Sequence, residues 1–546
     1  MSGLKLRRRR LEPIALSEVK YVNSVVAAQN DATEGHGAAY ELGAPLLSFG
    51  ILVVLFLAYD YCSYRLPPAV GRIFVLCHAG AILCVALVRV RWGLLFVLVS
   101  LIFADDIPRI ADAVGGASLH SLLTVPVAGV AAGNYAVFGV CAIGAFVLLV
   151  RWSQHPRPPK LRQADVCILG ILSLYVVAVL HGLPWVFSNF RGFLNDLNFP
   201  IMAGGLYLIT RAYVDTPEKL ARFWTALFMA AAVKTVVWAV WFLLGIGATI
   251  GTRLRVSTES GRVLLVFVLA YGLILQDKRL VACRRQRLLA VFVTIAAAFN
   301  LLFDGSRGPW VMSAYALAVL LALGRVRSKV RWFIVGCLSA ALVAVGLWWV
   351  RPETYAAVGY FWSTLKFWEE GNIARSHSTM VRVYEFKNIH EQLVDHDNLI
   401  LGEGPGSLFS DRYHPFPFGL QENDFLLDEV RQRQFQNPHG LLQNLILDTG
   451  YGGMTFYLCL VGLTYFWCFR VFRRLRAPPL RAIALSIIAF LPAMVYMSWS
   501  AKNNMLAGIF LGTIACLQGY VRVESSLSKA SDTKGTLQPA RAAPCD

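Results

Sequence analysis

Long apolar segments recur along this chain of 546 residues and constrain its fold more than any other feature. Each runs for about 15–25 residues, the length of helix that crosses a hydrocarbon core about 30 Å thick. Hydrophobic residues make up 57% of the chain and charged residues only 15%, whereas a soluble protein carries about 25% charged residues. The pattern predicts an all-α, polytopic membrane protein with about 12–14 transmembrane helices and one large loop domain.

The apolar segments divide the chain into five predicted regions. These are a basic cytoplasmic tail at 1–42, transmembrane helices at 43–350, a polar loop domain at 351–440, further transmembrane helices at 441–521 and a disordered tail at 522–546. The individual spans are predicted at 43–61, 70–88, 93–104, 133–150, 165–183, 196–213, 221–246, 262–276, 287–303, 309–324, 331–350, 441–469, 481–499 and 503–521.

The net charge of +18 is concentrated in the short connections between the predicted spans. With the N-terminus in the cytoplasm, the cytoplasmic connections are rich in Lys and Arg, among them 151–162, 211–222 and 470–481. This distribution follows the positive-inside rule and places both termini in the cytoplasm. It accounts for the basic charge without a nucleic acid, so we expect the lipid bilayer as a partner and no nucleic acid.

A polar insert at 351–440 interrupts the apolar pattern and carries five of the ten histidines. They are His377, His390, His396, His414 and His439. The insert has too many aromatic and aliphatic residues for a disordered linker, so we expect a small folded cap over a membrane site. The spacing of Val381, Ile389 and Leu393 predicts an amphipathic cap helix over 379–395.

The cysteine pattern argues against a metal or disulfide framework. Eleven cysteines are scattered along the chain, many inside predicted spans. No two are spaced as Cys-x-x-Cys, so neither a zinc site nor a set of disulfides is indicated. An aspartate-rich metal motif is also lacking in the sequence, and we therefore expect no metal and no other cofactor.

Basic residues at the predicted outer ends of the spans are the exception to the charge rule. They are Arg191, Arg253, Arg255, Arg262 and Arg307. One alternative is structural, with pairing to nearby carboxylates such as Glu259 and Asp304 or to lipid phosphates. As a set facing one compartment they suit a diphosphate better, because guanidinium groups stay charged and bind phosphate through a bidentate fork.

Arg307 has the most specific surroundings among these arginines. Gly305 and Gly308 predict a tight turn, and Pro309 falls near the first position of the following helix. Backbone donors at that helix N-terminus would add to an anion site.

Two motifs in and beside the insert admit a functional interpretation. In LGEGPGSLF, at 401–409, three alternating glycines are compatible with a phosphate-binding loop. A turn-rich structural loop is favoured, because no Gly-Lys-Ser/Thr follows and no strand-to-helix context is visible. In NPHGLLQNLILDTGYGGM, at 437–454, His439 lies where the chain re-enters the membrane. It is either an ordinary helix-start residue or a general base, since histidine accepts a proton near neutral pH.

Three motifs in this order, with a large outer loop between the first two, resemble the O-antigen ligase/polymerase family. They are Ser-Arg-Gly at 306–308, LGEGPGSLF at 401–409 and NPHGLLQNLILDTGYGGM at 437–454. The similarity covers roughly residues 250–470. The last motif departs from the family pattern at Gly440, where the family has asparagine, but Leu442, Gln443, Gly450 and Gly453 fit it.

The resemblance implies a metal-independent, inverting glycosyltransferase on the periplasmic face of the bacterial inner membrane. Such enzymes move a glycan from a polyprenyl diphosphate, such as undecaprenyl diphosphate, to an acceptor hydroxyl of the lipid A core. The family's functional residues carry over to His439 as the catalytic residue, to Arg307, and to Arg255 or Arg253. Arg382 matches a weaker basic position ahead of the cap helix.

Three alternatives remain open from the sequence. A polymerase of the same family would extend another lipid-linked glycan. A transporter or lipid flippase would carry polar residues deep in its spans and broken helices near the midplane. A non-catalytic assembly scaffold would tolerate the loss of Arg307.

Overall fold

The structure is a computed structural model that describes the greater part of the chain between residues 68 and 522. The described residues are 54, 68–103, 126–127, 130–154, 161–243, 248–250, 253–255, 259–277, 284–303, 307–323, 342, 377–416, 425, 427–436, 438, 440–497 and 506–522. The predicted tails at 1–42 and beyond 522, nearly all of the predicted spans at 43–61 and 331–350, and His439 lie outside these residues.

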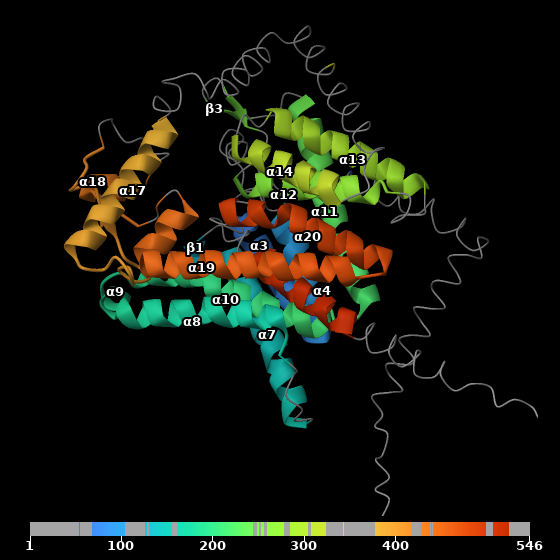
Figure 1. Cartoon of the computed structure of the whole chain (residues 1–546), viewed down its shortest axis with the longest axis horizontal. Coiled ribbons are helices and arrows are strands. Elements are labelled where there is room, and N and C mark those ends of the chain that lie inside the picture. Colours follow the sequence, from blue (N-terminus) through green and yellow to red (C-terminus); the bar gives the residue numbers. More distant parts are fainter. Residues whose placement is uncertain are drawn as a thin grey trace, which may run out of the picture. The chain divides into compact units, whose positions relative to one another are not determined.

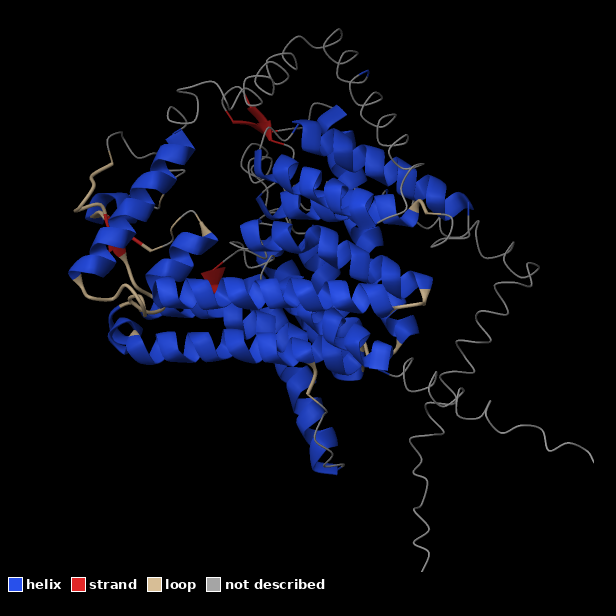
Figure 2. Cartoon of the chain, viewed as in Figure 1, coloured by secondary structure: helices blue, strands red, loops and turns tan. Residues whose placement is uncertain are grey.

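Helices dominate the described part of the chain, as the sequence predicted (Figure 2). They are α3 (Pro68–Val88), α4 (Val90–Phe103), α7 (Ala132–Gln154), α8 (Gln163–His181), α9 (Leu183–Ser188), α10 (Phe190–Tyr213), α11 (Pro217–Leu243), α12 (Glu259–Leu275), α13 (Arg284–Phe303), α14 (Arg307–Leu323), α17 (His377–Asp395), α18 (Leu427–Gln432), α19 (Leu441–Arg474), α20 (Pro478–Met497) and a C-terminal helix, Leu506–Arg522. Among the described residues the strands form three short antiparallel pairs: β1 (Pro126–Val127) with β2 (Val130–Ala131), β3 (Ala248–Ile250) with β4 (Arg253–Arg255), and β5 (Phe409–Ser410) with β6 (Gln434–Phe435).

Four of the described helices are long and apolar enough to cross a membrane. They are Tyr135–Gln154, Gln163–His181, Pro217–Val240 and Leu441–Arg474. Several other predicted spans correspond to shorter apolar helices, such as Val263–Leu275 and Gly308–Leu323. The prediction of an all-α fold is therefore confirmed for the described residues, and these four helices are compatible with the predicted membrane spans.

Helices α8 and α19 pack against each other in opposite directions, and Figure 1 shows them beside α10. A Cβ atom added to Gly170 of α8 would lie 2.9 Å from Leu460 Cδ1 of α19. A Cβ atom added to Gly453 of α19 would lie 2.9 Å from Leu174 Cδ1 of α8. Glycine at these positions allows the close helix approach on which packing between apolar helices depends.

The C-terminal helix runs parallel to α10 and also approaches its neighbour closely at two glycines. A Cβ atom on Gly508 would lie 2.4 Å from the Ala203 carbonyl oxygen, and one on Gly512 would lie 3.0 Å from the Tyr207 carbonyl oxygen. Two small residues, four positions apart, thus bring the C-terminal helix onto α10.

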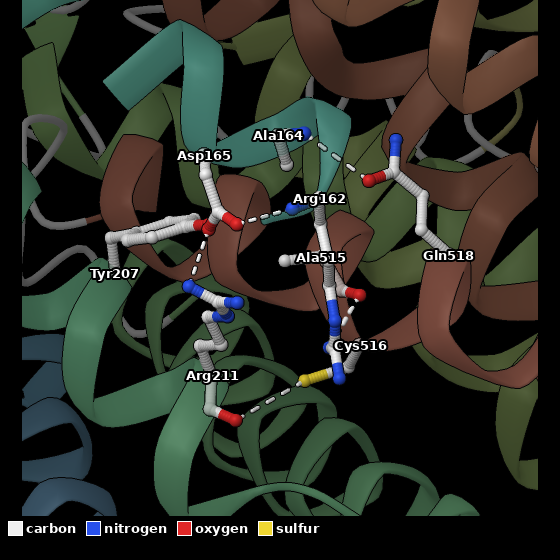
Figure 3. Close-up of polar contacts among 8 residues, drawn as sticks. All are labelled: Arg162, Ala164, Asp165, Tyr207, Arg211, Ala515, Cys516 and Gln518. Atoms are coloured by element: carbon white, nitrogen blue, oxygen red, sulfur yellow. Dashed lines mark hydrogen bonds and ion pairs between the residues drawn. The ribbon is translucent and has the colours of Figure 1, made fainter. Parts of the chain in front are cut away.

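A buried ionic cluster around Asp165 joins three helices at one end of this group (Figure 3). Arg211 Nη1, from the end of α10, lies 2.6 Å from Asp165 Oδ1 at the start of α8. The Tyr207 hydroxyl donates to the same oxygen, and the Arg162 backbone N–H donates to Asp165 Oδ2 at 2.5 Å. The Arg162 guanidinium in turn donates to the Ala515 carbonyl of the C-terminal helix at 2.7 Å. The basic connections on either side of α8 and α10 therefore meet at the same end of the helices.

Replacing Asp165 with alanine removes the carboxylate that Arg211 contacts. Because the Asp165 side chain is only 4% exposed, we expect the free energy of unfolding to fall by about 3–5 kcal/mol. Thermal or denaturant unfolding of the detergent-purified protein measures the change. The matched control is Asp215→Ala, whose 53% exposed carboxylate pairs with Lys219 one helical turn away and contributes about 1 kcal/mol or less. Equal losses for the two variants would contradict this account.

Candidate functional site

The described part of the large loop packs onto the start of α19. Its helix α17, which the sequence predicted over 379–395, buries Val381, Ile389 and Leu393. These side chains form one apolar cluster with the loop phenylalanines Phe409, Phe425 and Phe435 and with Ile446 and Leu447 of α19. In Figure 1, α17 and α18 lie beside the beginning of α19. The cap and α19 therefore share a core.

The glycines of LGEGPGSLF are required by close backbone contacts. Gly402, Gly404 and Gly406 have φ angles of +74°, +94° and +86°, which L side chains rarely adopt. A Cβ atom on Gly404 would lie 2.3 Å from Gly182 Cα, between α8 and α9. A Cβ atom on Gly402 would lie 2.5 Å from Gly450 N in α19. The segment 402–406 therefore fits against the helices only without side chains at these positions.

A break in α19 supplies the partners of this segment. Gly450 has a non-helical backbone (φ 68°, ψ −179°) inside α19. The N–H groups of Glu403 and Gly404 donate to the Leu447 and Asp448 carbonyl oxygens at 2.7 and 3.1 Å. Beyond the break, the Tyr451 and Gly452 N–H groups donate to carbonyl oxygens of residues 399 and 400 at 2.8 and 3.2 Å. We call the segment 399–406 together with the break at Gly450 the glycine clamp.

The glycine clamp decides between the two interpretations of the alternating glycines. A phosphate-binding loop needs backbone N–H groups that point at the anion. Here the Gly406 N–H donates to Asp196 Oδ2 of α10 at 2.7 Å, and the N–H groups of Glu403 and Gly404 donate to α19 carbonyl oxygens. These donors are already occupied, so the structural interpretation that the sequence favoured is confirmed.

His439 lies outside the described residues, but residues on either side of it contact α10 and α17. Gln443, in the first turn of α19, donates through Nε2 to the Arg382 carbonyl oxygen of α17 at 3.4 Å. A Cβ atom on Gly192 of α10 would lie 2.5 Å from Gln436 Nε2. We call the described residues 436, 438 and 440–443 the re-entry segment. It contacts the helix that carries Arg382 through Gln443 and the helix that carries Arg191 through Gln436.

The side chains of both of these arginines are exposed. Arg191 follows Phe190, the first residue of α10, and precedes the glycine that contacts Gln436. Arg382 lies on α17 with its side chain exposed and its carbonyl bonded to α19. The helices that carry two of the predicted arginines therefore contact residues on either side of the predicted catalytic histidine.

The other predicted arginines lie on elements at the end of the helices opposite the Asp165 cluster. Helix α11 begins beside the C-terminal helix, where Trp224 Nε1 donates to Thr513 Oγ1 at 3.2 Å. It ends beside the end of α13, where Asn300 Nδ2 donates to the Thr235 carbonyl at 2.7 Å. The β3–β4 hairpin follows α11, and α14 begins at Arg307 directly after α13. Both elements are therefore at the far end from the Asp165 cluster.

The hairpin register separates Arg253 from Arg255. Arg253 pairs with Ile250 next to the turn, whereas Arg255 pairs with Ala248 at the far end of the ladder, four residues before Glu259, where α12 begins. The side chains of Arg253, Arg255 and Arg307 are outside the described part of the structure. Their predicted contact with a diphosphate stays a prediction.

Three buried charged residues in predicted spans were given no role in the interpretation of the sequence. Asp196 is 8% exposed, Asp448 is 1% exposed, and Lys234 is 1% exposed in the middle of α11. Lys234 lies over the Trp238 ring, with Nζ 5.5 Å from the ring centroid. An ionisable residue within a predicted span is a signal of function or of specific pairing, and this signal was available at all three positions.

The described residues contain no group of three or more His, Cys, Asp or Glu side chains that could hold a metal ion. Two of the loop histidines have structural partners instead. His396 Nδ1 lies 2.7 Å from Glu403 Oε1, and His390 Nδ1 lies 3.0 Å from the Tyr451 hydroxyl. Both pairs join the cap to the glycine clamp or to α19.

In comparisons with known proteins, this chain matches no protein-family model and no curated protein. Its function must therefore be argued from the residues at the re-entry segment and at the ends of the neighbouring helices.

The glycine clamp predicts a large cost for a single methyl group. We expect Gly404→Ala to lower the free energy of unfolding by about 3 kcal/mol or more, because it combines a left-handed φ with a backbone clash. The matched control is Gly462→Ala in the same α19, where a Cβ atom meets nothing within 4 Å. Alanine there is expected to be neutral or to stabilise by up to about 1 kcal/mol. Unfolding in detergent measures both variants, and a Gly404→Ala protein as stable as the control would refute the clamp.

Proposed function

We propose that this protein transfers a glycan from a polyprenyl diphosphate to an acceptor hydroxyl, as an O-antigen ligase does with undecaprenyl diphosphate and the lipid A core. The observation that carries the proposal is the position of the re-entry segment. It contacts the helices of Arg191 and Arg382, through Gln436 and Gln443 respectively. The β3–β4 hairpin and the start of α14 lie at the far end of the helices from the Asp165 cluster.

The proposed site works at the periplasmic face of a bacterial inner membrane, in a protein with about 12–14 spans. The basic connections near Arg162 and Arg211 meet at one end of α8 and α10, whereas the cap contacts the other end of α8 at Gly182. This separation supports a cytoplasmic assignment for the basic end and both termini, and a periplasmic assignment for the cap.

The arginines neutralise the leaving diphosphate in this proposal. Arg307 and Arg255, with Arg253 as the alternative to Arg255, would hold its oxygens through bidentate forks. Fixed positive groups in a partly dry site stabilise the charge that develops in the transition state. This role needs no metal, in keeping with the expectation from the sequence. Arg191 and Arg382 would contact the donor or acceptor beside the re-entry segment.

His439 acts as the general base on the acceptor. The acceptor oxygen bonds to the anomeric carbon while the bond from that carbon to the diphosphate oxygen breaks. The electron pair of that bond leaves with the diphosphate, and the acceptor proton passes to His439. A single displacement from the opposite face inverts the anomeric centre. Lipid A core and a second lipid-linked glycan are both acceptors that present such a hydroxyl.

Two observations favour a second candidate, a lipid flippase. Lys234 is buried within a membrane-length helix, and α19 is broken at Gly450, and transporters use both features. In transporters the backbone groups at such a break bind the transported solute. Here the glycine clamp already pairs the groups on both sides of Gly450. Glycan transfer therefore remains the preferred proposal.

Replacing His439 with alanine tests the role of the base. We expect transfer in a reconstituted assay with polyprenyl-diphosphate-linked glycan to fall by about 100-fold or more. The control is His414→Ala in the same loop, where the backbone rather than the imidazole bonds to Asn388. Unchanged transfer by a folded His439→Ala protein would remove the residue from the mechanism.

The same assay separates the two related activities. Product that forms only when lipid A core is added indicates a ligase. Growth of the lipid-linked glycan without lipid A core indicates a polymerase of the same family. Movement of the donor across the bilayer without any new glycosidic bond would instead indicate the flippase.

Arg307 tests the diphosphate site. We expect Arg307→Ala to reduce transfer by about 100-fold or more, since it removes a fixed donor to the leaving group. Arg307→Lys keeps the charge but loses the planar fork, so it should restore only part of the rate. The control is Arg470→Lys, an exposed arginine near the other end of α19. Full activity of Arg307→Ala would favour a structural role for this arginine.

A further inference from the structure

We propose that Asp196 and Asp448 bind a hard metal cation, with calcium as the first choice, and that this cation holds the glycine clamp against α10 and α19. The site is separate from the proposed diphosphate site, and it does not depend on glycan transfer. Its role is structural: the cation would join the cap to two helices and thereby position the re-entry segment.

The two carboxylates come from distant parts of the sequence to the same short segment. Asp196 Oδ2 accepts from the Gly406 N–H at 2.7 Å. The backbone carbonyl of Asp448 accepts from the Gly404 N–H at 3.1 Å. The glycine clamp therefore contacts both aspartates, one through its side chain and the other through its backbone.

This pair is removed from water and from basic side chains. Asp196 is 8% exposed and Asp448 is 1% exposed. The rings of Tyr175, Phe199 and Tyr457 pack next to one another, and both tyrosines are buried. In the described part of the chain no Lys, Arg or His side chain bonds to either carboxylate, so the ionised form of these two buried groups would require another compensating group.

Unpartnered oxygen atoms identify the class of that group. Asn444 Nδ2 donates to Asp448 Oδ2 at 3.2 Å. Asp448 Oδ1 and Asn444 Oδ1 are both buried and lack a hydrogen-bond partner among the described residues, as does Ser407 Oγ, one residue beyond Gly406. A proton shared by the carboxylates would leave the amide oxygen unsatisfied. A hard cation can be coordinated by carboxylate, amide and hydroxyl oxygens at the same time.

The ligand set also selects among metals. Every candidate ligand is an oxygen, which suits calcium, magnesium or sodium and not the metals that prefer sulfur or imidazole. Two carboxylates balance a divalent charge, and calcium accepts irregular sets of oxygen ligands more readily than magnesium does. The set contains only two Asp or Glu side chains, so the sequence pattern of a metal site was absent.

The test uses the full-length protein, purified in detergent and treated with a chelator. Its melting temperature is measured with calcium, magnesium, sodium or choline chloride at constant ionic strength. We expect saturating calcium to raise the melting temperature of the wild-type protein by roughly 3 °C or more. The shift should disappear in Asp448→Asn and persist in Asp428→Asn, which changes an exposed carboxylate on α18.

Direct binding keeps the proposal testable if Asp448→Asn fails to fold. Radioactive calcium should be retained by the wild-type protein at about one ion per chain and be lost from Asn444→Ala. Failure of the wild-type protein to retain calcium, magnesium or sodium would overturn the proposal. So would a calcium shift of equal size in Asp448→Asn, or a melting temperature that responds to pH between 5 and 8 but to no cation, which would indicate a shared proton.

Discussion

The contact between the glycine clamp and the helices is the constraint on which the rest of the described loop depends. At Gly404 the backbone of the loop approaches that of Gly182 so closely that a methyl group would overlap it. The break at Gly450 frees backbone groups of α19, and the loop pairs with them on both sides. Because these contacts are between backbones, they fix the loop without relying on flexible side chains. The cap helix α17 and the re-entry segment are held in place from this point.

The two ends of the helix group are built from different chemistry. At one end, Asp165 and Arg211 form a buried ion pair among connections rich in arginine. At the other, the contacts are made by glycines, by backbone carbonyls and by the aromatic core of the cap. The arginines proposed to bind diphosphate belong to elements at this second end. Under the proposed function, this asymmetry would keep the charge that orients the protein apart from the charge that binds the substrate.

The helices could be predicted from the sequence because long apolar segments mark them by composition and length. It also identified α17, since Val381, Ile389 and Leu393 recur with helical spacing. The role of the alternating glycines could be argued from the sequence only by elimination. Their contact with Gly182 joins segments that are distant in sequence, and their contact with Gly450 depends on a break inside an apolar helix. The contact of Asp196 and Asp448 with the same glycine clamp could not be predicted for the same reason, because about 250 residues separate them and only packing brings them to it. Gly440 could be recognised as a departure from the family motif, and it is the N-cap of α19.

The central claim is that this protein forms a glycosidic bond by a single displacement at a polyprenyl diphosphate. The most direct measurement is the anomeric configuration of the product, determined by NMR after reconstitution of the wild-type protein with a donor of known configuration. The account predicts a product whose anomeric centre is inverted relative to the donor. A product with retained configuration, or a donor that is moved across the bilayer and never transferred, would contradict it.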